Sequence, residues 1–577
     1  MDACYAIRMA DQLDMKKITP IIVILVFLVG AFLRIWQISR VPISLFGDEL
    51  DVGYQAYSIL KTGKDYYGNF LPIHFHSLAE WRTPLYLYSS VPTVALFGIS
   101  PLGVRLPAAI FGILSIFALY LLVKEITKNH RLALLASFVM AISPWHLQYS
   151  RAGFEATQLL FLLILGLYFF FKALEAKGKM LWVSVGLLAL TPWVYSTAKL
   201  FTPLLLLFLL WVWRKEIFSF SQKHLFYAIL SLFIIGGPIA YSTFFGGGTQ
   251  RFNNLSIFND PVLETEIGAL RQVDVSMQGQ TGKVFHNKLT YWGGNFIRNY
   301  FQSFSTEFLF IKGDLNLRQS IGTGEFYRVD ALVLILGLIF FFTKFPNRKF
   351  KSLIAFWILV GVVPAALTRD GGNHATRLIL ILPPLIFLIA YGLMETYKAL
   401  AMNYRKLFVL GYGILLFICF IGYQHTYWVH YPLESERWWH AGFEESIQAI
   451  KSIDKNYDKV VISTANEPPW IFFAAWYEYP PVDWQKNFPI GNDVELPGFG
   501  KVSHIGKFYF GSPQKDVGIY EIEQYIDSKT LYLAVASEIG ANLIIEPQRT
   551  PPGLKLVKAI SYLSGEPAFY LFAGNKI

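Results

Sequence analysis

Long apolar runs separated by short polar segments dominate the chain as far as residue 424. Each run is long enough, or nearly so, to cross a bilayer as an α-helix, which takes about 20 residues. The runs lie at 18–38, 104–123, 132–147, 157–174, 181–198, 200–213, 224–243, 329–343, 352–367, 377–396 and 407–424. The pattern therefore predicts a polytopic α-helical membrane protein with about eleven spans.

A shorter apolar stretch, "PLYLYSSVPTVALFG" at 84–98, contains Pro92 and decides the topology. If this stretch does not cross, all the basic clusters fall on one side of the membrane, as the positive-inside rule requires. These clusters are Lys16 with Lys17, 124–131, 172–179, 214–216, 344–351 and 397–406. We therefore expect 84–98 to be a re-entrant or juxtamembrane helix.

With this topology, most of the hydrophilic mass lies on the outer face of the membrane. The tail has its own pattern, in which β-rich runs at 459–464, 531–537, 542–547 and 568–573 accompany a helical stretch at 440–453. About 150 residues are enough for one α/β domain with its own core. We predict a transmembrane domain at 1–424, with outer loops 39–103 and 244–328, and an extracytoplasmic soluble α/β domain at 425–577.

Composition supports a membrane protein, because 54% of the 577 residues are hydrophobic and only 16% are charged. The net charge of +10 comes from basic residues in short clusters between apolar runs. That distribution is typical of cytoplasmic loops, so we predict no nucleic-acid partner.

An acidic stretch, "FGDELD" at 46–51, follows the first apolar run. One interpretation is a helix start, with Asp48 as the N-cap, Asp51 as its partner in a capping box, and Gly63 ending the helix. The other interpretation is catalysis. The local pattern leaves both interpretations open.

Charges of both signs follow in the same outer loop and favour a functional role. Glu80 and Arg82 begin the short stretch, and Arg105 lies at the outer edge of the second span. A single ionisable group at a span edge usually extends to the interface and has no further role. Several groups of both signs suit a substrate that is an anion tethered to a lipid.

The succession of these segments resembles a known family. The stretches are "GDELDVGYQAYSILKTG", "AEWRTPLYLYSSVPTVALFG" and "VRLPAAIFGILSIFALYLL". They are similar to the first outer loop and second span of the protein mannosyltransferases and aminoarabinose transferases of the GT-C superfamily (glycosyltransferase family 39-like). The resemblance covers 18 to about 210 and returns at 371–393. It implies a multi-pass plasma-membrane enzyme that uses a polyprenyl-phosphate-linked sugar on the extracytoplasmic face and inverts the anomeric centre.

The resemblance also implies roles for particular residues. The family's Asp-Glu pair falls on Asp48 and Glu49, with Asp48 as the catalytic base and Glu49 or Glu80 positioning the substrate. The second motif falls on Glu80, Arg82 and Pro84. Because the aminoarabinose transferases have an Arg where this chain has Asp51, the lipid phosphate needs other ligands. The predicted phosphate ligands are Arg82, Arg105 and Arg377.

Other assignments rest on weaker patterns. Arg377 is equally well explained as a residue that extends to the interface, and Tyr86 and Tyr88 are predicted to line a lipid groove although interfacial aromatics are common. His74 and His76 have a spacing that can serve a divalent metal, but we predict no required cofactor.

The predicted partners are a polyprenyl-phosphate-linked sugar, the lipid bilayer, and an acceptor that is a protein, a glycolipid or a polysaccharide. The alternative function is a transporter or flippase of lipid-linked sugars. Such a protein would place its charges within broken helices of repeated halves, and no repeat is visible in the sequence.

Overall fold

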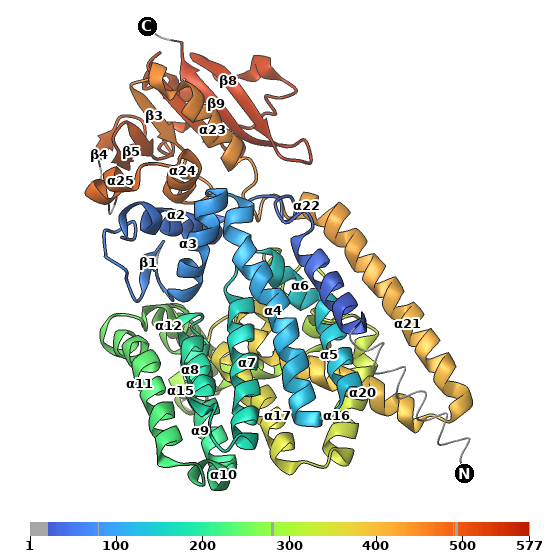
Figure 1. The fold of residues 1–577 in the computed structure, drawn as a ribbon. Coiled ribbons are helices and arrows are strands. Elements are labelled where there is room, and N and C mark those ends of the chain that lie inside the picture. Colours follow the sequence, from blue (N-terminus) through green and yellow to red (C-terminus); the bar gives the residue numbers. More distant parts are fainter. Residues whose placement is uncertain (1–20, 79, 279–281, 489, 491–493, 576–577) are drawn as a thin grey trace, which may run out of the picture. The chain divides into compact units, whose positions relative to one another are not determined.

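The computed structural model describes residues 21–78, 80–278, 282–488, 490 and 494–575. Contacts divide the chain into two compact units, and Figure 1 labels the helices and strands of both. Unit 1 consists of residues up to Trp36, Glu80–Tyr86 and Pro107–Thr426, and unit 2 consists of Gln37–Ala79, Leu87–Leu106 and Tyr427–Ile577. This division groups most of the first outer loop with the tail and so does not test a boundary after residue 424. That boundary stays a prediction.

Within the described residues, every predicted apolar run coincides with one or more helices, and the start of the first run, 18–20, lies outside them. Among the described residues, six helices are long and apolar enough to cross a membrane: Pro101–Thr127, Ala156–Glu175, Gln222–Phe245, Arg348–Ala366, Ala375–Ala399 and Met402–Glu434. The pair α5 (His130–Ile142) and α6 (Pro144–Arg151), bent by 58°, makes a seventh if it counts as one span. The total of about eleven spans stays a prediction.

Shorter helices account for the remaining runs. The apolar ones are Ile21–Ile35, α3 (Leu85–Phe97), α8 with its 3₁₀ extension (Leu181–Trp193) and α9 (Ala198–Val212), and α16 (Asp330–Lys344) completes the set. The 13-residue α3 is the predicted short helix at 84–98, with Pro92 inside it. Because other helices kept as predicted spans are equally short, the length of α3 does not decide whether it crosses, and its assignment as a non-crossing helix stays a prediction.

Unit 1 is a bundle with close helix contacts. The chain Leu382–Ala399 forms α20, which is buried over most of its length and packs against α16. Two glycines allow this approach, since a Cβ at Gly337 would lie 2.1 Å from the Leu388 carbonyl oxygen and one at Gly392 would lie 2.3 Å from that of Val333. Small residues at such contacts are typical of membrane helices.

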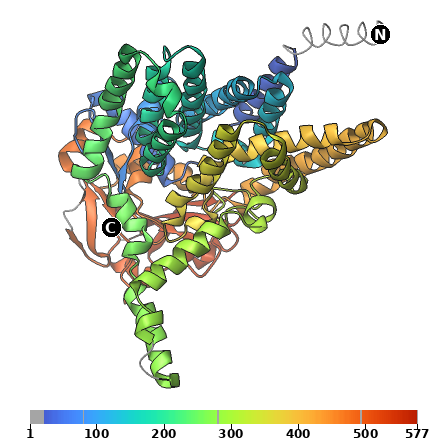
Figure 2. The ribbon, with the colours of Figure 1, turned by 90° about the horizontal axis from the view of Figure 1, so that it is seen from below.

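The segment between residues 244 and 328 is largely helical. Its helices are α12 (Gln250–Leu255), α13 (Leu263–Gln278), α14 (Gly282–Phe285) and α15 (Lys288–Gln302), followed by a π-helical turn at Glu307–Ile311. In Figure 2 the light-green part of this segment extends away from the bundle of unit 1.

Unit 2 contains a seven-stranded sheet with the order β4-β5-β6-β3-β7-β9-β8. The strands are β3 (Lys459–Ile462), β4 (Val494–Leu496), β5 (Gly500–Ile505), β6 (Phe508–Phe510), β7 (Thr530–Val535), β8 (Leu554–Ser561) and β9 (Pro567–Gly574). Strand β3 pairs in parallel with β6 and β7, and the outer pairs are antiparallel. The α/β pattern predicted for the tail is thus confirmed.

One predicted strand of the tail, at 542–547, is wrong. This stretch is a turn followed by a short 3₁₀ helix at Pro547–Arg549. The Leu543 amide donates to the Tyr570 hydroxyl (3.0 Å) rather than to a neighbouring strand. The Leu543 side chain is buried in the core, which explains why the stretch is apolar without being a strand.

Helices cover both faces of this sheet. On one face, Phe473 of α24 (Trp470–Tyr477) packs against Phe508 of β6, with ring centroids 4.4 Å apart. On the same face, α23 (Phe443–Ile453) places Phe443 against Phe569 of β9, at 4.5 Å. The other face packs on a cluster that comprises Ile519 of α26 (Gly518–Glu521) together with Val461, Ile522, Ile526, Tyr532, Ile539 and Leu543.

Within unit 2, the first outer loop packs on the tail. Helix α2 (Gly47–Thr62) contacts α24 and α25 (Pro481–Asn487). The Tyr54 hydroxyl donates to the Tyr479 carbonyl oxygen (2.9 Å), and the Tyr54 ring meets Trp484 at 5.6 Å. The helix that carries the acidic stretch is therefore supported by residues more than 400 positions later in the chain.

Candidate functional site

The acidic stretch forms the first turn of α2. Its N-cap is Phe46, which has an extended backbone and makes no side-chain cap, so the predicted capping role of Asp48 is wrong. The helix ends as predicted at Gly63, whose φ of 70° is left-handed. Asp48 and Glu49 lie in the first turn, where the exposed amides of the helix favour negative charge.

The first of the three acids differs from the others in exposure. Asp48 is half-buried, whereas Glu49 and Asp51 are buried. Asp51 accepts hydrogen bonds from the Tyr66 hydroxyl and the Ser77 hydroxyl, each at 2.8 Å. These bonds tie α2 to the loop that follows it. Asp51 therefore holds the loop in place, and the catalytic role expected of Asp48 stays a prediction.

Glu49 forms a buried bidentate ion pair with Arg105. The Arg105 Nε and Nη2 donate to the two Glu49 carboxylate oxygens at 2.8 and 2.9 Å. The same guanidinium donates to the carbonyl oxygens of Ile38 (3.2 Å), Pro42 (2.7 Å) and Ser44. Because its donors are engaged and its side chain is fully buried, we leave Arg105 out of the phosphate site. The Glu49–Arg105 pair therefore ties the first turn of α2 to the backbone at Ile38, Pro42 and Ser44.

Arg82 lies in unit 1, at the end of β2 (Glu80–Arg82). Its guanidinium is buried and lies 3.8 Å from a carboxylate oxygen of Glu155. The next residue, Thr83, donates to the Val194 carbonyl oxygen at 2.6 Å and anchors the segment. Glu155 was not predicted, although its position in the short turn at 150–157 was available from the sequence. The side chain of Glu80 lies outside the described residues.

A cavity of about 320 Å³ opens in unit 1 near this segment. Three cationic side chains line it, from Lys199, Arg251 and Arg377. The wall also contains hydroxyls and large apolar groups, from Trp81, Thr83, Ser196, Thr197, Leu200, Thr243, Phe244, Thr249, Phe252, Leu255, Pro364, Leu367 and Thr368. A cavity that combines cations with an apolar wall suits a ligand with an anionic head and an apolar chain.

Lys199 and Arg251 were not predicted. The Lys199 ammonium donates to the Gly248 carbonyl oxygen at 3.1 Å, and Arg251 stacks on the Tyr195 ring at 5.8 Å. Lys199 separates two apolar runs, at 181–198 and 200–213, and a lone cation at such a break is the signal that could have identified it.

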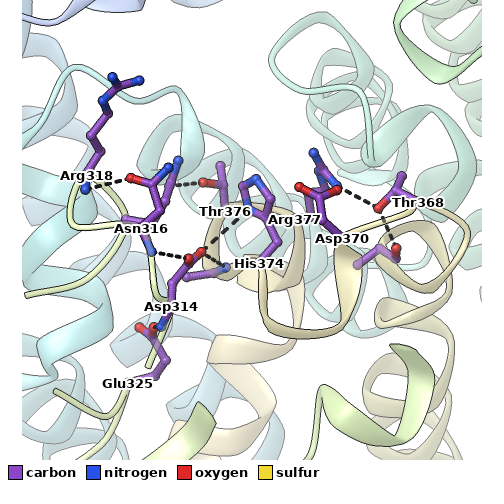
Figure 3. A network of polar contacts seen from close by, with 12 residues as sticks. Asp314, Asn316, Arg318, Glu325, Thr368, Asp370, His374, Thr376 and Arg377 are labelled. Atoms are coloured by element: carbon purple, nitrogen blue, oxygen red, sulfur yellow. Dashed lines mark hydrogen bonds and ion pairs between the residues drawn. The ribbon is translucent and has the colours of Figure 1, made fainter. Parts of the chain in front are cut away.

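The predicted residue Arg377 lies in the short helix α19 (Ala375–Leu378) and is part of a polar network with the loop before it (Figure 3). Its guanidinium donates to the Thr368 hydroxyl at 2.8 Å and pairs with Asp370. The Thr368 backbone carbonyl in turn accepts from the Asn299 amide at 2.7 Å. Arg377 is buried and held in one orientation, which is unlike a residue that simply extends to the membrane surface.

Two buried acids support this loop. Asp314 accepts from the backbone amides of Asn316 and Ala375, each at 2.9 Å, and its own amide donates to Glu325 at 3.2 Å (Figure 3). Burial raises the pKa of Asp314 to about 6, with a further contribution from Asp370. Burial also raises the pKa of Glu325 well above its usual value.

We expect the stability difference between Asp314→Asn and the wild-type protein to change with pH. A pKa raised from 3.8 to about 6 means that the folded state binds this proton more tightly, so the wild-type protein loses stability as pH rises from about 4 to 6. The loss is on the order of 3 kcal/mol. Thermal unfolding of both proteins between pH 4 and pH 8 should show that the stability of the variant rises relative to that of the wild type as pH rises.

Comparing the two proteins separates the contribution of Asp314 to the pH dependence of stability from the contributions of the other titratable groups of the network. These groups are Glu325, Asp370 and His374, which lie with Arg377. Burial and the charge of Arg377 lower the pKa of His374 to about 3, so His374 contributes a trend of opposite sign in both proteins. A stability difference that is constant across this pH range would contradict a buried, titrating Asp314.

The remaining predicted residues take separate places. Tyr86 is buried, and the Tyr88 hydroxyl donates to the Pro72 carbonyl oxygen at 2.9 Å, so their role in a lipid groove stays a prediction. His74 is buried and His76 is half-buried. Among the described residues, no three His, Cys, Asp or Glu side chains are grouped so that they could hold a metal ion.

Part of the chain is similar in sequence to known proteins. Residues 82–241 match the family model of the dolichyl-phosphate-mannose-protein mannosyltransferases. YkcB and YycA of Bacillus subtilis (strain 168), which carry the name mannosyltransferase, are 28% identical over 171 residues and 27% identical over 164 residues. These matches cover 29% and 28% of this chain and 22% of each relative.

The fold also resembles a solved structure. The crystal structure of ArnT from Cupriavidus metallidurans bound to undecaprenyl phosphate superposes with a TM-score of 0.51 at 11% identity. The superposition covers 95% of this chain and 97% of ArnT. Together, the family model, the named relatives and the fold confirm the resemblance to the GT-C glycosyltransferases that the sequence motifs indicate.

Proposed function

From the premise that this chain has the fold and the family match of a GT-C membrane glycosyltransferase, we propose that it transfers a sugar from a polyprenyl-phosphate-linked donor to an acceptor hydroxyl. The reaction takes place on the extracytoplasmic face of the plasma membrane and inverts the anomeric centre. The observation that carries the proposal is the cavity of unit 1, which joins three cations to an apolar wall.

The donor phosphate is the group that this cavity suits best. Lys199 and Arg251 provide charge, and Arg377 presents a guanidinium that Thr368 and Asp370 hold in place. Charge-assisted bonds from such groups to phosphate are stronger than neutral ones, and a guanidinium can make two in parallel. The apolar residues of the wall, such as Phe244 and Leu255, suit the first prenyl units.

The leaving group also determines what the cations do during the reaction. As the bond between the anomeric carbon and the phosphate oxygen breaks, negative charge on the phosphate grows. Fixed cations stabilise that charge more than they stabilise the ground state, which is how an electrostatic site accelerates a reaction. The carrier leaves as free lipid phosphate.

Asp48 is the proposed base. It accepts the proton of the acceptor hydroxyl while the hydroxyl oxygen forms a bond to the anomeric carbon, opposite the departing phosphate. Attack from that side inverts the configuration in one step. The buried Glu49–Arg105 pair holds the first turn of α2, so the Asp48 carboxylate is presented in a fixed position. Orientation of this kind and general-base assistance each lower the barrier.

We expect Arg251→Ala and Lys199→Ala each to weaken the binding of undecaprenyl phosphate about tenfold to hundredfold, because each removes a charged partner worth about 1.5–3 kcal/mol. The matched control is Arg298→Ala, which removes an exposed arginine on α15 that donates to the nearby Asn295 side chain. Titration of the purified protein in detergent, followed by native mass spectrometry, measures the affinity.

Unchanged affinity in both cavity variants would contradict the assignment of this cavity to the donor phosphate. An equal loss in the Arg298→Ala control would show that the effect is one of general surface charge and would also contradict it.

A further inference from the structure

A large cavity lies in unit 1 between α21 (Met402–His425) and the helices beside it. Its volume is about 760 Å³, within the range of about 300–1,000 Å³ that ligand sites occupy. The wall comes mainly from α5, α20 and α21. Helix α21 lies at the edge of the bundle (Figure 1), and only 6% of its apolar stretch is buried, against 89% for the segment that contains α20. The cavity therefore separates a loosely packed span from the bundle.

The cavity follows α21 over the depth of about one leaflet. The lining of this helix runs from Phe408 to Phe420. At about 1.5 Å per residue that stretch is about 18 Å long, close to half of a hydrocarbon core about 30 Å thick. Two of its lining side chains, Val409 and Phe417, are 55% and 64% exposed. The cavity is thus open toward the bilayer and has the length of an acyl chain.

Cationic side chains lie at one end of this cavity. Arg131 is in the first turn of α5, and Lys398 is in the last turn of α20. Arg131 is exposed, and its guanidinium has no ion-pair partner within the described part of the chain. The Lys398 ammonium pairs with Glu395 at 2.7 Å. Both cations belong to the basic clusters that the positive-inside rule assigns to the cytoplasmic side.

A second cavity, of about 590 Å³, adjoins the first at the same end. It adds two further cations, Arg405 and Lys406. The Arg405 guanidinium is held in place, since it donates to the carbonyl oxygens of Leu400 (3.0 Å) and Lys398 (3.1 Å). The described residues that line the two cavities include no Asp or Glu. The lining residues that the two cavities share are Tyr397, Val409, Gly413 and Phe417.

We infer that these adjoining cavities bind one anionic glycerophospholipid of the cytoplasmic leaflet. Its phosphate lies among Arg131, Lys398 and Lys406, and its two acyl chains lie along α21. Basic pockets between membrane helices on the cytoplasmic side suit the headgroups of anionic lipids, which are enriched in that leaflet. Two apolar cavities that meet at one group of cations match a single charged headgroup that carries two chains.

This site is separate from the cavity proposed for the donor phosphate. Arg377 precedes α20, whereas Lys398 lies in its last turn. The 18 residues of α20 span about 27 Å at about 1.5 Å per residue, close to the thickness of the hydrocarbon core. A lipid with its phosphate at Lys398 therefore belongs to the other leaflet from a donor with its phosphate at Arg377.

The headgroup is tested with the full-length protein, freed of lipid in detergent. Native mass spectrometry follows its titration with phosphatidylglycerol and with phosphatidylethanolamine of the same acyl chains. We expect phosphatidylglycerol to bind at least tenfold more tightly, and Arg131→Gln to weaken its binding about tenfold. The matched control is Arg348→Gln, which removes an exposed arginine at the start of α17 (Arg348–Gly361), outside both cavities. It should leave the affinity unchanged.

The place of the chains is tested by filling the cavity. A Cβ at Gly413 would meet no atom within 4 Å, so Gly413→Leu extends into open space without a clash. We expect it to weaken phosphatidylglycerol binding at least tenfold. Gly411→Leu is the matched control, because Gly411 is equally open on the same helix but lines neither cavity. Melting curves without lipid should show that both variants fold as the wild type does.

Four results would overturn the inference. Equal affinity for the two lipids would show that the headgroup is not recognised, and unchanged affinity in Arg131→Gln and Gly413→Leu would show that the lipid binds elsewhere. Displacement of phosphatidylglycerol by undecaprenyl phosphate would assign the cavities to the prenyl carrier. A dimer mass that is lost in Gly413→Leu would assign them to a second copy of the chain. Since no sugar donor is present, these outcomes do not depend on the proposed transferase reaction.

Discussion

Asp48→Asn is expected to lower turnover by about 10²- to 10⁴-fold, the usual contribution of a general base. The amide has nearly the same shape as the carboxylate but cannot accept a proton from the acceptor hydroxyl. The Glu49–Arg105 pair and the first turn of α2 remain, so folding and donor binding should stay intact. Release of free lipid phosphate from a purified polyprenyl-phosphate sugar measures the effect.

The control for this variant is Asp483→Asn, which neutralises an exposed acid in α25 of the same unit. It should turn over at the wild-type rate. Normal turnover by Asp48→Asn would show that Asp48 is not the base. If the melting temperature of Asp48→Asn falls and unfolded protein accounts for the lost turnover, the acid mainly supports α2.

Arg105→Ala is expected to destabilise the protein by about 3–5 kcal/mol, because it leaves the Glu49 carboxylate buried without its partner. The carbonyl oxygens of Ile38, Pro42 and Ser44 lose a donor at the same time. Unfolding of wild type, Arg105→Ala, Glu49→Ala and the double variant forms a double-mutant cycle that isolates the pair.

Arg437→Ala serves as the control for this cycle, since Arg437 makes an exposed pair with Glu566, and exposed pairs contribute little to stability. We expect the double variant to be more stable than the sum of the two single changes predicts. If Arg105→Ala left stability unchanged and weakened donor binding instead, Arg105 would be a phosphate ligand and the positioning role would be wrong.

The features that were predictable from sequence are those set by local pattern. Apolar runs form helices because a segment in lipid must satisfy its own backbone hydrogen bonds, and no distant residue is needed to see this. The helix stop at Gly63 follows from the left-handed backbone that glycine allows. Strands β3 and β7 follow from the runs of β-branched and aromatic residues at 459–464 and 531–537.

Features that depend on distant contacts could not be predicted. The packing of Tyr54 on Tyr479 and Trp484 joins segments that no periodicity relates, so the first outer loop was assigned apart from the tail. The engagement of Arg105 with Glu49 and three carbonyls depends on the same long-range packing. A motif shows that a charged residue is present, but only the fold shows which residue pairs with it.

The candidate site divides in the same way. Asp48, Arg82 and Arg377 lie in motifs whose residue types can be recognised, and the structure gives each a defined setting. Lys199 and Arg251 come from two separate segments and meet only as the wall of one cavity. Sequence therefore predicts the chemistry of an anionic, lipid-linked substrate, while the structure shows which cations line one cavity.

The central claim is that this chain consumes a polyprenyl-phosphate-linked sugar. Purified wild-type protein in lipid vesicles is supplied with a panel of such donors together with peptide, glycolipid and polysaccharide acceptors, and free lipid phosphate and glycosylated product are followed by mass spectrometry. We predict that one donor is converted to free lipid phosphate, with one equivalent of sugar transferred to an acceptor. Movement of intact lipid-linked sugar across the vesicle membrane, with no donor consumed, would contradict the account and favour a flippase.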